Sequence, residues 1–155
     1  MEREEKLKEM VNGSLYCETE LELVVLLNNI VGKNYDEAEN LIEKIEKVIS
    51  KIKAIDSNII VMVDNCYGEF VEEKEPTEVG ADLFISSLMK NLGAGIATSG
   101  GYVVGRKDLI HKVAERLTAP CIGKDLGANF NQMLPYYKGI FMAPSVVKSV
   151  LKTMT

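Results

Sequence analysis

Two short apolar runs, residues 59–63 and 83–87, set the fold class expected for this chain of 155 residues. Each is rich in Ile, Val, Leu or Phe and is bounded by turn residues, which is typical of a buried strand. The first run follows residues 36–54, whose apolar side chains recur at the helical period, with Glu and Lys on the opposite face. A helix, a short loop and a buried strand form a crossover unit, so the sequence predicts an α/β fold.

The second half of the chain predicts three more elements. Residues 102–104 read as a third strand and residues 107–117 as an amphipathic helix. A last helix is expected to begin at Pro144, because proline is favoured at the first position of a helix. Between residues 64 and 105 no helical pattern occurs, so we expect a short mixed or parallel sheet flanked by helices.

The stretch over residues 21–30 is almost entirely apolar. Thr19 and Glu22 have the spacing of a capping box, so this stretch is predicted to be a helix. Its apolar side chains would nearly encircle the helix, which requires burial on several sides. We therefore expect this segment to drive self-association and the chain to form a homo-oligomer.

Both apolar runs lead to charged side chains at their carboxyl ends, where α/β sheets bind ligands. The first run is followed directly by Asp64, and the second by Lys90 and then by glycines. Pyridoxal phosphate (PLP) needs a lysine that forms a Schiff base and a carboxylate that keeps the pyridine nitrogen protonated. The pair is a candidate PLP site. The alternatives are a surface lysine at a strand end and an aspartate that caps the following turn.

Long sequence words around these two residues carry a family resemblance. They are VDNCYGEFVE (63–72), EPTEVGADL (75–83), SSLMKN (86–91), GAGIATSGGYVVGR (93–106) and RLTAPCIG (116–123), with GIFMAPSVV (139–147) as a looser match. These words resemble the methionine γ-lyase-like proteins, also called the aluminium-resistance family, among the fold-type-I PLP enzymes of cysteine and methionine metabolism. The resemblance implies part of the large domain of a fold-type-I PLP-transferase, with PLP as cofactor and a sulfur-containing amino acid as substrate.

The resemblance also implies roles by position. Lys90 resembles the catalytic Schiff-base lysine, Asp64 the partner of the pyridine nitrogen, and Ser87 the serine that contacts the cofactor phosphate. Asn65 and Tyr67 lie in the same word and are given supporting roles. A Schiff-base lysine should be partly buried, because burial lowers its pKa and frees the amine lone pair.

The chain departs from the family in its length. Family members are several hundred residues long, and their glycine-rich phosphate cup precedes the Asp-containing strand, whereas residues 1–63 hold only Gly13 and Gly32. We divide the chain into an unmatched helical segment (1–35), the core of the PLP-binding domain (36–123) and the start of a connection to a C-terminal domain (124–155). It is interpreted as a fragment or truncated homologue of a PLP-dependent carbon–sulfur lyase. The alternative is an inactive remnant that self-associates, or complements a separate chain, without PLP.

Composition argues against several other classes. The formal net charge of −5 disfavours a nucleic-acid surface, which is usually basic. Three cysteines without a C-x-x-C motif, and a single histidine, argue against a zinc site or a disulfide scaffold and suit a reducing cytoplasm. The charged first ten residues do not resemble a secretory signal, and no apolar run approaches the roughly 18 residues of a membrane span.

Several further residues have more than one interpretation. The glycines between residues 93 and 101 could approach a phosphate in a nucleotide-binding module, but they lack the G-x-x-x-x-G-K-[ST] pattern and suit tight turns. Cys66 could be a redox thiol, although a small buried side chain is the commoner role. Arg106 could form a salt bridge or a phosphate contact. Tyr136 and Tyr137 are expected to pack within the protein rather than to stack on a cofactor ring.

Overall fold

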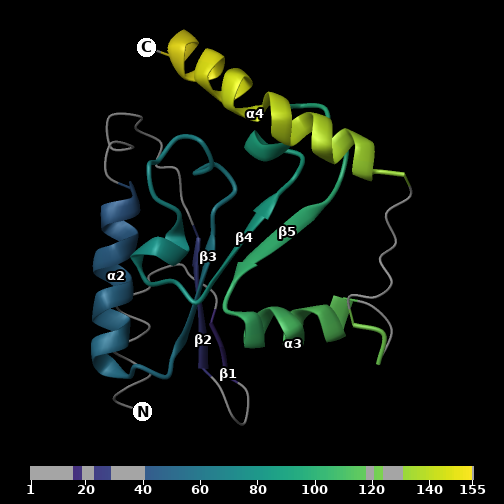
Figure 1. Cartoon of the computed structure of the whole chain (residues 1–155). Coiled ribbons are helices and arrows are strands. Elements are labelled where there is room, and N and C mark those ends of the chain that lie inside the picture. Colours follow the sequence, from purple (N-terminus) through teal and green to yellow (C-terminus); the bar gives the residue numbers. More distant parts are fainter. Residues whose placement is uncertain (1–15, 19–22, 29–40, 118–120, 124–130, 155) are drawn as a thin grey trace.

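One mixed sheet organises the structure. The computed structural model describes residues 16–18, 23–28, 41–117, 121–123 and 131–154 (Figure 1). Strands β2, β3 and β4 are parallel to one another, while β1 and β5 are antiparallel to their neighbours. The predicted α/β fold with a short mixed sheet is therefore confirmed. The sheet follows chain order, with β1 (Tyr16–Glu18), β2 (Leu23–Asn28), β3 (Ile60–Asp64), β4 (Leu83–Ser87) and β5 (Gly101–Gly105).

Helices cover both faces of the sheet and one of its ends (Figure 1). Helix α2 (Leu41–Ile55) packs Ile52 in one apolar core with Val61 and Val63 of β3. Helix α3 (Lys107–Leu117) packs Leu109 in a second core with Ile60 of β3. Because successive side chains of a strand point to opposite faces, β3 contributes to both cores. Helix α4 (Met133–Met154) lies across the ends of β4 and β5.

Most element boundaries agree with the sequence analysis. The strands expected at 59–63, 83–87 and 102–104 and the helix at 107–117 appear within one residue of those limits. The helix expected at 36–54 is observed over Leu41–Ile55, and residues 36–40 lie outside the described part of the chain. The capping box at Thr19 and Glu22 also lies outside it.

The helix predicted over residues 21–30 is wrong, because Leu23–Asn28 is strand β2. It pairs in parallel with β3, and the register places Asn28 beside Asp64. A continuous apolar run suits a strand covered on both faces as well as it suits a buried helix, and periodicity alone does not separate the two. The segment thus extends the sheet that carries Asp64.

The prediction that Pro144 begins the last helix is also wrong. Helix α4 begins at Met133, and Pro144 lies inside it. A proline removes one helical hydrogen bond, and packing of the preceding turns can offset that loss. Such packing is present, because Gly139 is buried against the backbone of Gly93.

Asp82, just before β4, joins the two helical layers. Its carboxylate accepts hydrogen bonds from Lys53 Nζ of α2 at 2.6 Å, from the Val61 amide at 2.9 Å and from Arg106 at 3.0 Å. Burial alone would raise the pKa of Asp82, but these three donors lower it below its ordinary value. Arg106 also pairs with Asp108, so of its two predicted roles the salt bridge is the one observed.

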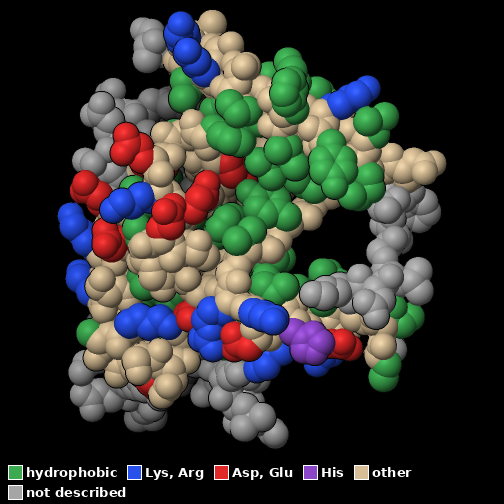
Figure 2. Space-filling model, viewed as in Figure 1, with side chains coloured by type: hydrophobic (Ala, Val, Ile, Leu, Met, Phe, Trp, Pro, Cys, Tyr) green, Lys and Arg blue, Asp and Glu red, His purple; other side chains and the backbone are tan. Residues whose placement is uncertain are grey.

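The described surface carries an apolar area over α4. Figure 2 shows hydrophobic side chains gathered there and just below it. The most exposed apolar residues of α4 are Leu134, Tyr137 and Phe141, which we call the α4 apolar face, and Phe141 is 83% exposed. Among the described helices, none combines the length and apolar character needed to cross a membrane.

Candidate functional site

Asp64 stands where β3 ends, at the edge of the sheet that ligands occupy in α/β proteins. It is half-buried, and the register pairs it with Ile85 of β4, two residues before Ser87. One oxygen of its carboxylate accepts a hydrogen bond from the Cys66 amide at 3.2 Å. Asp64 therefore caps the following turn, which was one of its two interpretations, and the bond fixes its side chain at this edge.

Lys90 follows β4 at the same edge and lies against the segment that follows Asp64. Its Nζ is 4.2 Å from the centre of the Tyr67 ring, within the range of a cation–π interaction. Burial would lower the pKa of Lys90, but interactions with the Cys66 thiol and the Tyr67 hydroxyl outweigh it and raise that pKa. The expectation of a lowered lysine pKa is therefore wrong for this structure, because two groups that favour the ammonium form lie next to the amine.

Cys66 lies between the two predicted site residues. Burial and the Asp64 carboxylate raise the pKa of its thiol, and Lys90 acts in the opposite direction. A side chain that interacts with both Asp64 and Lys90 shows that the fold brings these two residues to one locality. Cys66 is half-buried there and is thus not simply a small side chain filling the core.

Ser87 closes the turn that leads to Lys90. Its hydroxyl oxygen accepts a hydrogen bond from the Met89 amide at 3.2 Å, and its carbonyl accepts one from the Lys90 amide at 3.3 Å. Accepting the Met89 bond leaves the hydroxyl proton free for an acceptor such as phosphate. The role of Ser87 in phosphate binding stays a prediction.

The turn after Lys90 packs closely on α4. It is the short 3-10 helix η3 (Asn91–Gly93), and a Cβ atom at Gly139 would lie 2.7 Å from the Gly93 carbonyl oxygen. A Cβ atom at Gly100 would lie 2.6 Å from the Tyr136 hydroxyl. Tyr136 therefore packs as predicted, whereas the same prediction is wrong for Tyr137, which is exposed.

A buried acidic network beneath this edge was not foreseen from the sequence. Glu69 is only 2% exposed, and its Oε1 accepts hydrogen bonds from Ser86 and, at 2.7 Å, from the Tyr102 hydroxyl. Its other oxygen, Oε2, has no hydrogen-bond partner among the described residues. Burial and the Glu69 carboxylate raise the pKa of Tyr102. The only clue in the sequence was that Glu69 lies in the same motif as Asp64, residues 63–72.

Glu75 extends this network to the loop before β4. Its carboxylate accepts a hydrogen bond from the side-chain NH2 group of Asn65 at 2.9 Å. Burial and the nearby Glu69 and Glu78 raise the pKa of Glu75, because like charges disfavour its ionised form. Asn65 thus helps to hold the loop, and its supporting role at the cofactor site stays a prediction.

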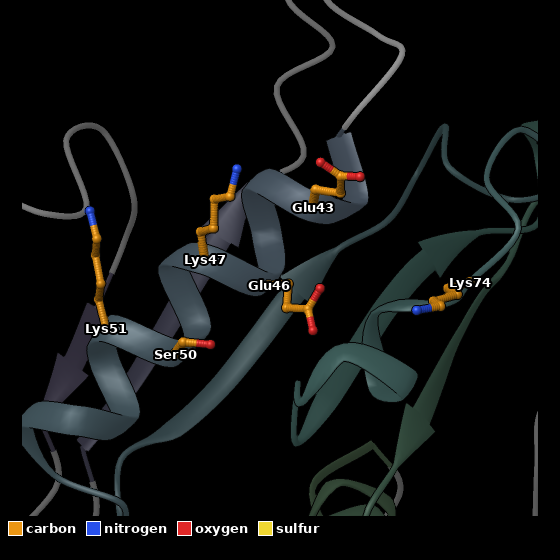
Figure 3. A pocket seen from close by; sticks show the side chains of 6 residues that line it. All are labelled: Glu43, Glu46, Lys47, Ser50, Lys51 and Lys74. Atoms are coloured by element: carbon orange, nitrogen blue, oxygen red, sulfur yellow. The ribbon is translucent and has the colours of Figure 1, made fainter.

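A separate hollow lies away from this edge, between α2 and the loop that holds Lys74. Figure 3 shows its charged and polar side chains pointing in different directions, without converging on one point. Neither Asp64 nor Lys90 lines it, and no group of three or more metal-binding side chains occurs in the described residues. The hollow therefore adds nothing to the site. It is lined by Glu43, Glu46, Lys47, Ser50, Lys51 and Lys74.

Comparison with known proteins places this edge in a family context. The family model described as methionine gamma-lyase matches residues 8–155, including most of the N-terminal segment for which the sequence words gave no resemblance. A carbon-sulfur lyase involved in aluminum resistance from Clostridium novyi NT is 44% identical in sequence. It superimposes with a TM-score of 0.73 over 83% of this chain and 30% of its own.

Two curated relatives are also similar. The uncharacterized protein YnbB of Bacillus subtilis (strain 168) is 50% identical over 72% of this chain. The uncharacterized 33.9 kDa protein in the glnA 5'region of Lactobacillus delbrueckii subsp. bulgaricus is 44% identical over 79% of it. The chain spans 27% and 40%, respectively, of the length of these relatives.

Proposed function

Since the chain belongs to the methionine gamma-lyase family, we propose that it forms part of a PLP-dependent carbon–sulfur lyase that acts on sulfur-containing amino acids. The observation that carries the proposal is the position of Asp64 and Lys90 at the carboxyl ends of two neighbouring parallel strands. Cys66 interacts with both side chains. The carbon–sulfur lyase of Clostridium novyi NT supports the same chemistry.

The donor set at this edge fits the reactive part of PLP. The Asp64 carboxylate, already fixed by the Cys66 amide, would hold the proton on the pyridine nitrogen. The Lys90 amine would bond the cofactor carbonyl carbon, whose oxygen would leave as water, and the Ser87 hydroxyl would donate a hydrogen bond to the phosphate. When bound, PLP supplies an electron sink for negative charge at the α carbon of an amino acid.

The protein's own step is proton transfer by Lys90. Its amine would take the proton from the substrate α carbon and return it later in the reaction, which releases a thiol, ammonia and an oxo acid and consumes water. The amine must first lose its own proton. Because Cys66 and Tyr67 raise the pKa of Lys90, cofactor attachment should increase as the pH rises from neutral.

The first test is reductive trapping on the chain as it exists. The protein is mixed with PLP and reduced with borohydride, and peptide mass spectrometry then maps the pyridoxyl groups. We expect a dominant adduct on Lys90 that Lys90→Ala abolishes, whereas Lys107→Ala, an exposed lysine on α3, leaves it in place. Equal labelling of surface lysines with no preference for Lys90 would contradict the proposal.

A second candidate is a domain without bound PLP that complements a separate chain. It is favoured by the exposed α4 apolar face. This candidate predicts that no specific PLP adduct forms on Lys90 and that Lys90→Ala leaves the association of the chain unchanged. A cytoplasmic location, expected from the cysteine pattern, stays part of either proposal.

A further inference from the structure

Asn91 links the turn that carries Lys90 to the loop that follows Asp64. Its side-chain amide donates to the main-chain carbonyl oxygens of Tyr67 and Glu69, each at 3.1 Å. An asparagine NH2 group has two protons, so one side chain makes both bonds. The connection runs through backbone atoms of the loop and does not involve the side chains of Asp64 and Lys90.

The loop that receives these bonds is itself fixed to the sheet. The buried Glu69 carboxylate accepts hydrogen bonds from Ser86 on β4 and from Tyr102 on β5. Cys66 and Tyr67, the two groups that face the Lys90 amine, belong to the same loop. Asn91 therefore links the turn that carries Lys90 to a loop whose residues Cys66 and Tyr67 are held in place by the sheet.

The other side of the turn is also held. Gly93 approaches Leu88 so closely that an added Cβ would meet the Leu88 carbonyl oxygen, and Gly139 of α4 lies against Gly93. This packing fixes the end of η3, and the hydrogen bond from the Lys90 amide to the Ser87 carbonyl ties residue 90 to the end of β4. Neither contact joins the turn directly to the 65–70 loop. The Asn91 bonds supply that link.

We propose that Asn91 is a positioning residue for Lys90, which holds the amine beside Cys66 and Tyr67 so that it faces a group bound at Asp64. This inference rests on the proposed function, because positioning serves a reaction of the Lys90 amine. Asn91 acts through the loop and the lysine and does not itself touch the reacting atoms. A residue with a purely structural role would change folding stability and leave the chemical behaviour of Lys90 unchanged.

The test measures Lys90 in the absence of PLP. Trace acetylation with acetic anhydride between pH 7 and 11, followed by peptide mass spectrometry, reports the fraction of each lysine present as free amine. In Asn91→Leu, which keeps a similar volume and removes both donors, Lys90 should leave its neighbours and its pKa should fall. We expect its labelling at pH 9 to rise at least about threefold, because a lower pKa leaves more of the amine unprotonated at that pH. Lys107 is the internal reference.

Two further variants keep the test decisive. Asn91→Gln retains the donors and should stay closer to the parent, and Asn91→Ser replaces Asn91→Leu if circular dichroism shows that the latter is unfolded. With PLP and borohydride, Asn91→Leu should trap about tenfold less cofactor on Lys90 than the parent.

An acetylation profile of Lys90 identical in parent and folded variant would overturn the positioning role, as would normal trapping by that variant. If the parent itself traps no PLP, the proposed function fails, while the acetylation comparison still decides the role of Asn91.

Discussion

Cys66 is the residue at which the site can be tested most directly, because its thiol interacts with both Asp64 and Lys90. Burial and the Asp64 carboxylate raise its pKa, so less thiolate is present at a given pH than for an ordinary cysteine. We expect iodoacetamide at pH 8 to modify Cys66 at least about threefold more slowly than the exposed Cys121. Peptide mass spectrometry over time gives both rates in one sample, and equal rates would contradict the described environment.

Asp82 should give the largest stability effect of a single polar residue. Its pKa is lowered in the folded state, so it contributes stability above its ordinary pKa of 3.8 and loses it as the pH falls through the folded value. Asp82→Asn places an amide among three donors and should reduce the free energy of unfolding at pH 7 by about 3 kcal/mol. Below pH 4 the difference between parent and variant should shrink.

Thermal unfolding of Asp82→Asn and the parent across pH 3 to 7 checks this expectation. Asp108→Asn is the matched control, because Asp108 pairs with the same Arg106 but is exposed. Its loss should change the free energy of unfolding far less than Asp82→Asn does, because solvent screens the exposed pair. A pH-independent difference between Asp82→Asn and the parent would show that packing and not ionisation sets the role of Asp82.

Among the helices and strands, the sequence correctly predicted the ones whose residue pattern fits only one type of secondary structure. The 83–87 run and the 107–117 pattern gave β4 and α3 at their observed limits. The run at 21–30 failed because an apolar stretch without polar alternation fits a covered strand and a buried helix equally. The helix start predicted at Pro144 was wrong because the preceding turns of α4 pack on Gly93, a residue distant in sequence.

The contact between α4 and η3 gives a prediction that opposes helix propensity. In an exposed helix, Gly→Ala stabilises by about 1 kcal/mol. At Gly139 the added Cβ would meet backbone atoms of Gly93 at 2.7 to 3.0 Å, and backbone cannot rotate away. We therefore expect Gly139→Ala to destabilise the protein by about 1 to 3 kcal/mol in chemical denaturation. Lys138→Ala, at the exposed neighbouring position, should be nearly neutral, and a stabilised Gly139→Ala would refute the close approach.

For the whole molecule, the sequence identified Asp64, Ser87 and Lys90 as site candidates but not the network that holds them. A match to a family motif identifies single residues and not the contacts between them. Asn91, Glu69 and Tyr102 act through contacts between residues 22 to 33 positions apart in the chain. Such contacts arise only once the strands have paired. The same limit applies to the expected homo-oligomer. Its contact was predicted on residues 21–30, and the exposed apolar side chains of α4 become a second candidate only once that helix is formed.

The α4 apolar face predicts how copies of the chain associate. Leu134, Tyr137 and Phe141 are spaced three and four residues apart, so they share one side of the helix, and all three are exposed. Contiguous exposed apolar surface of this kind is a common mark of a protein interface.

We expect the parent to form a dimer or larger oligomer through this face and the double variant Leu134→Ser/Phe141→Ser to shift it toward monomer. Leu117→Ser, which removes a leucine of α3 that is even more exposed than Leu134, should not shift it. Sedimentation velocity over a hundredfold range of concentration separates the cases. A parent that stays monomeric throughout, or a double variant that associates as the parent does, would exclude α4 as the contact and leave this face to the remaining family sequence.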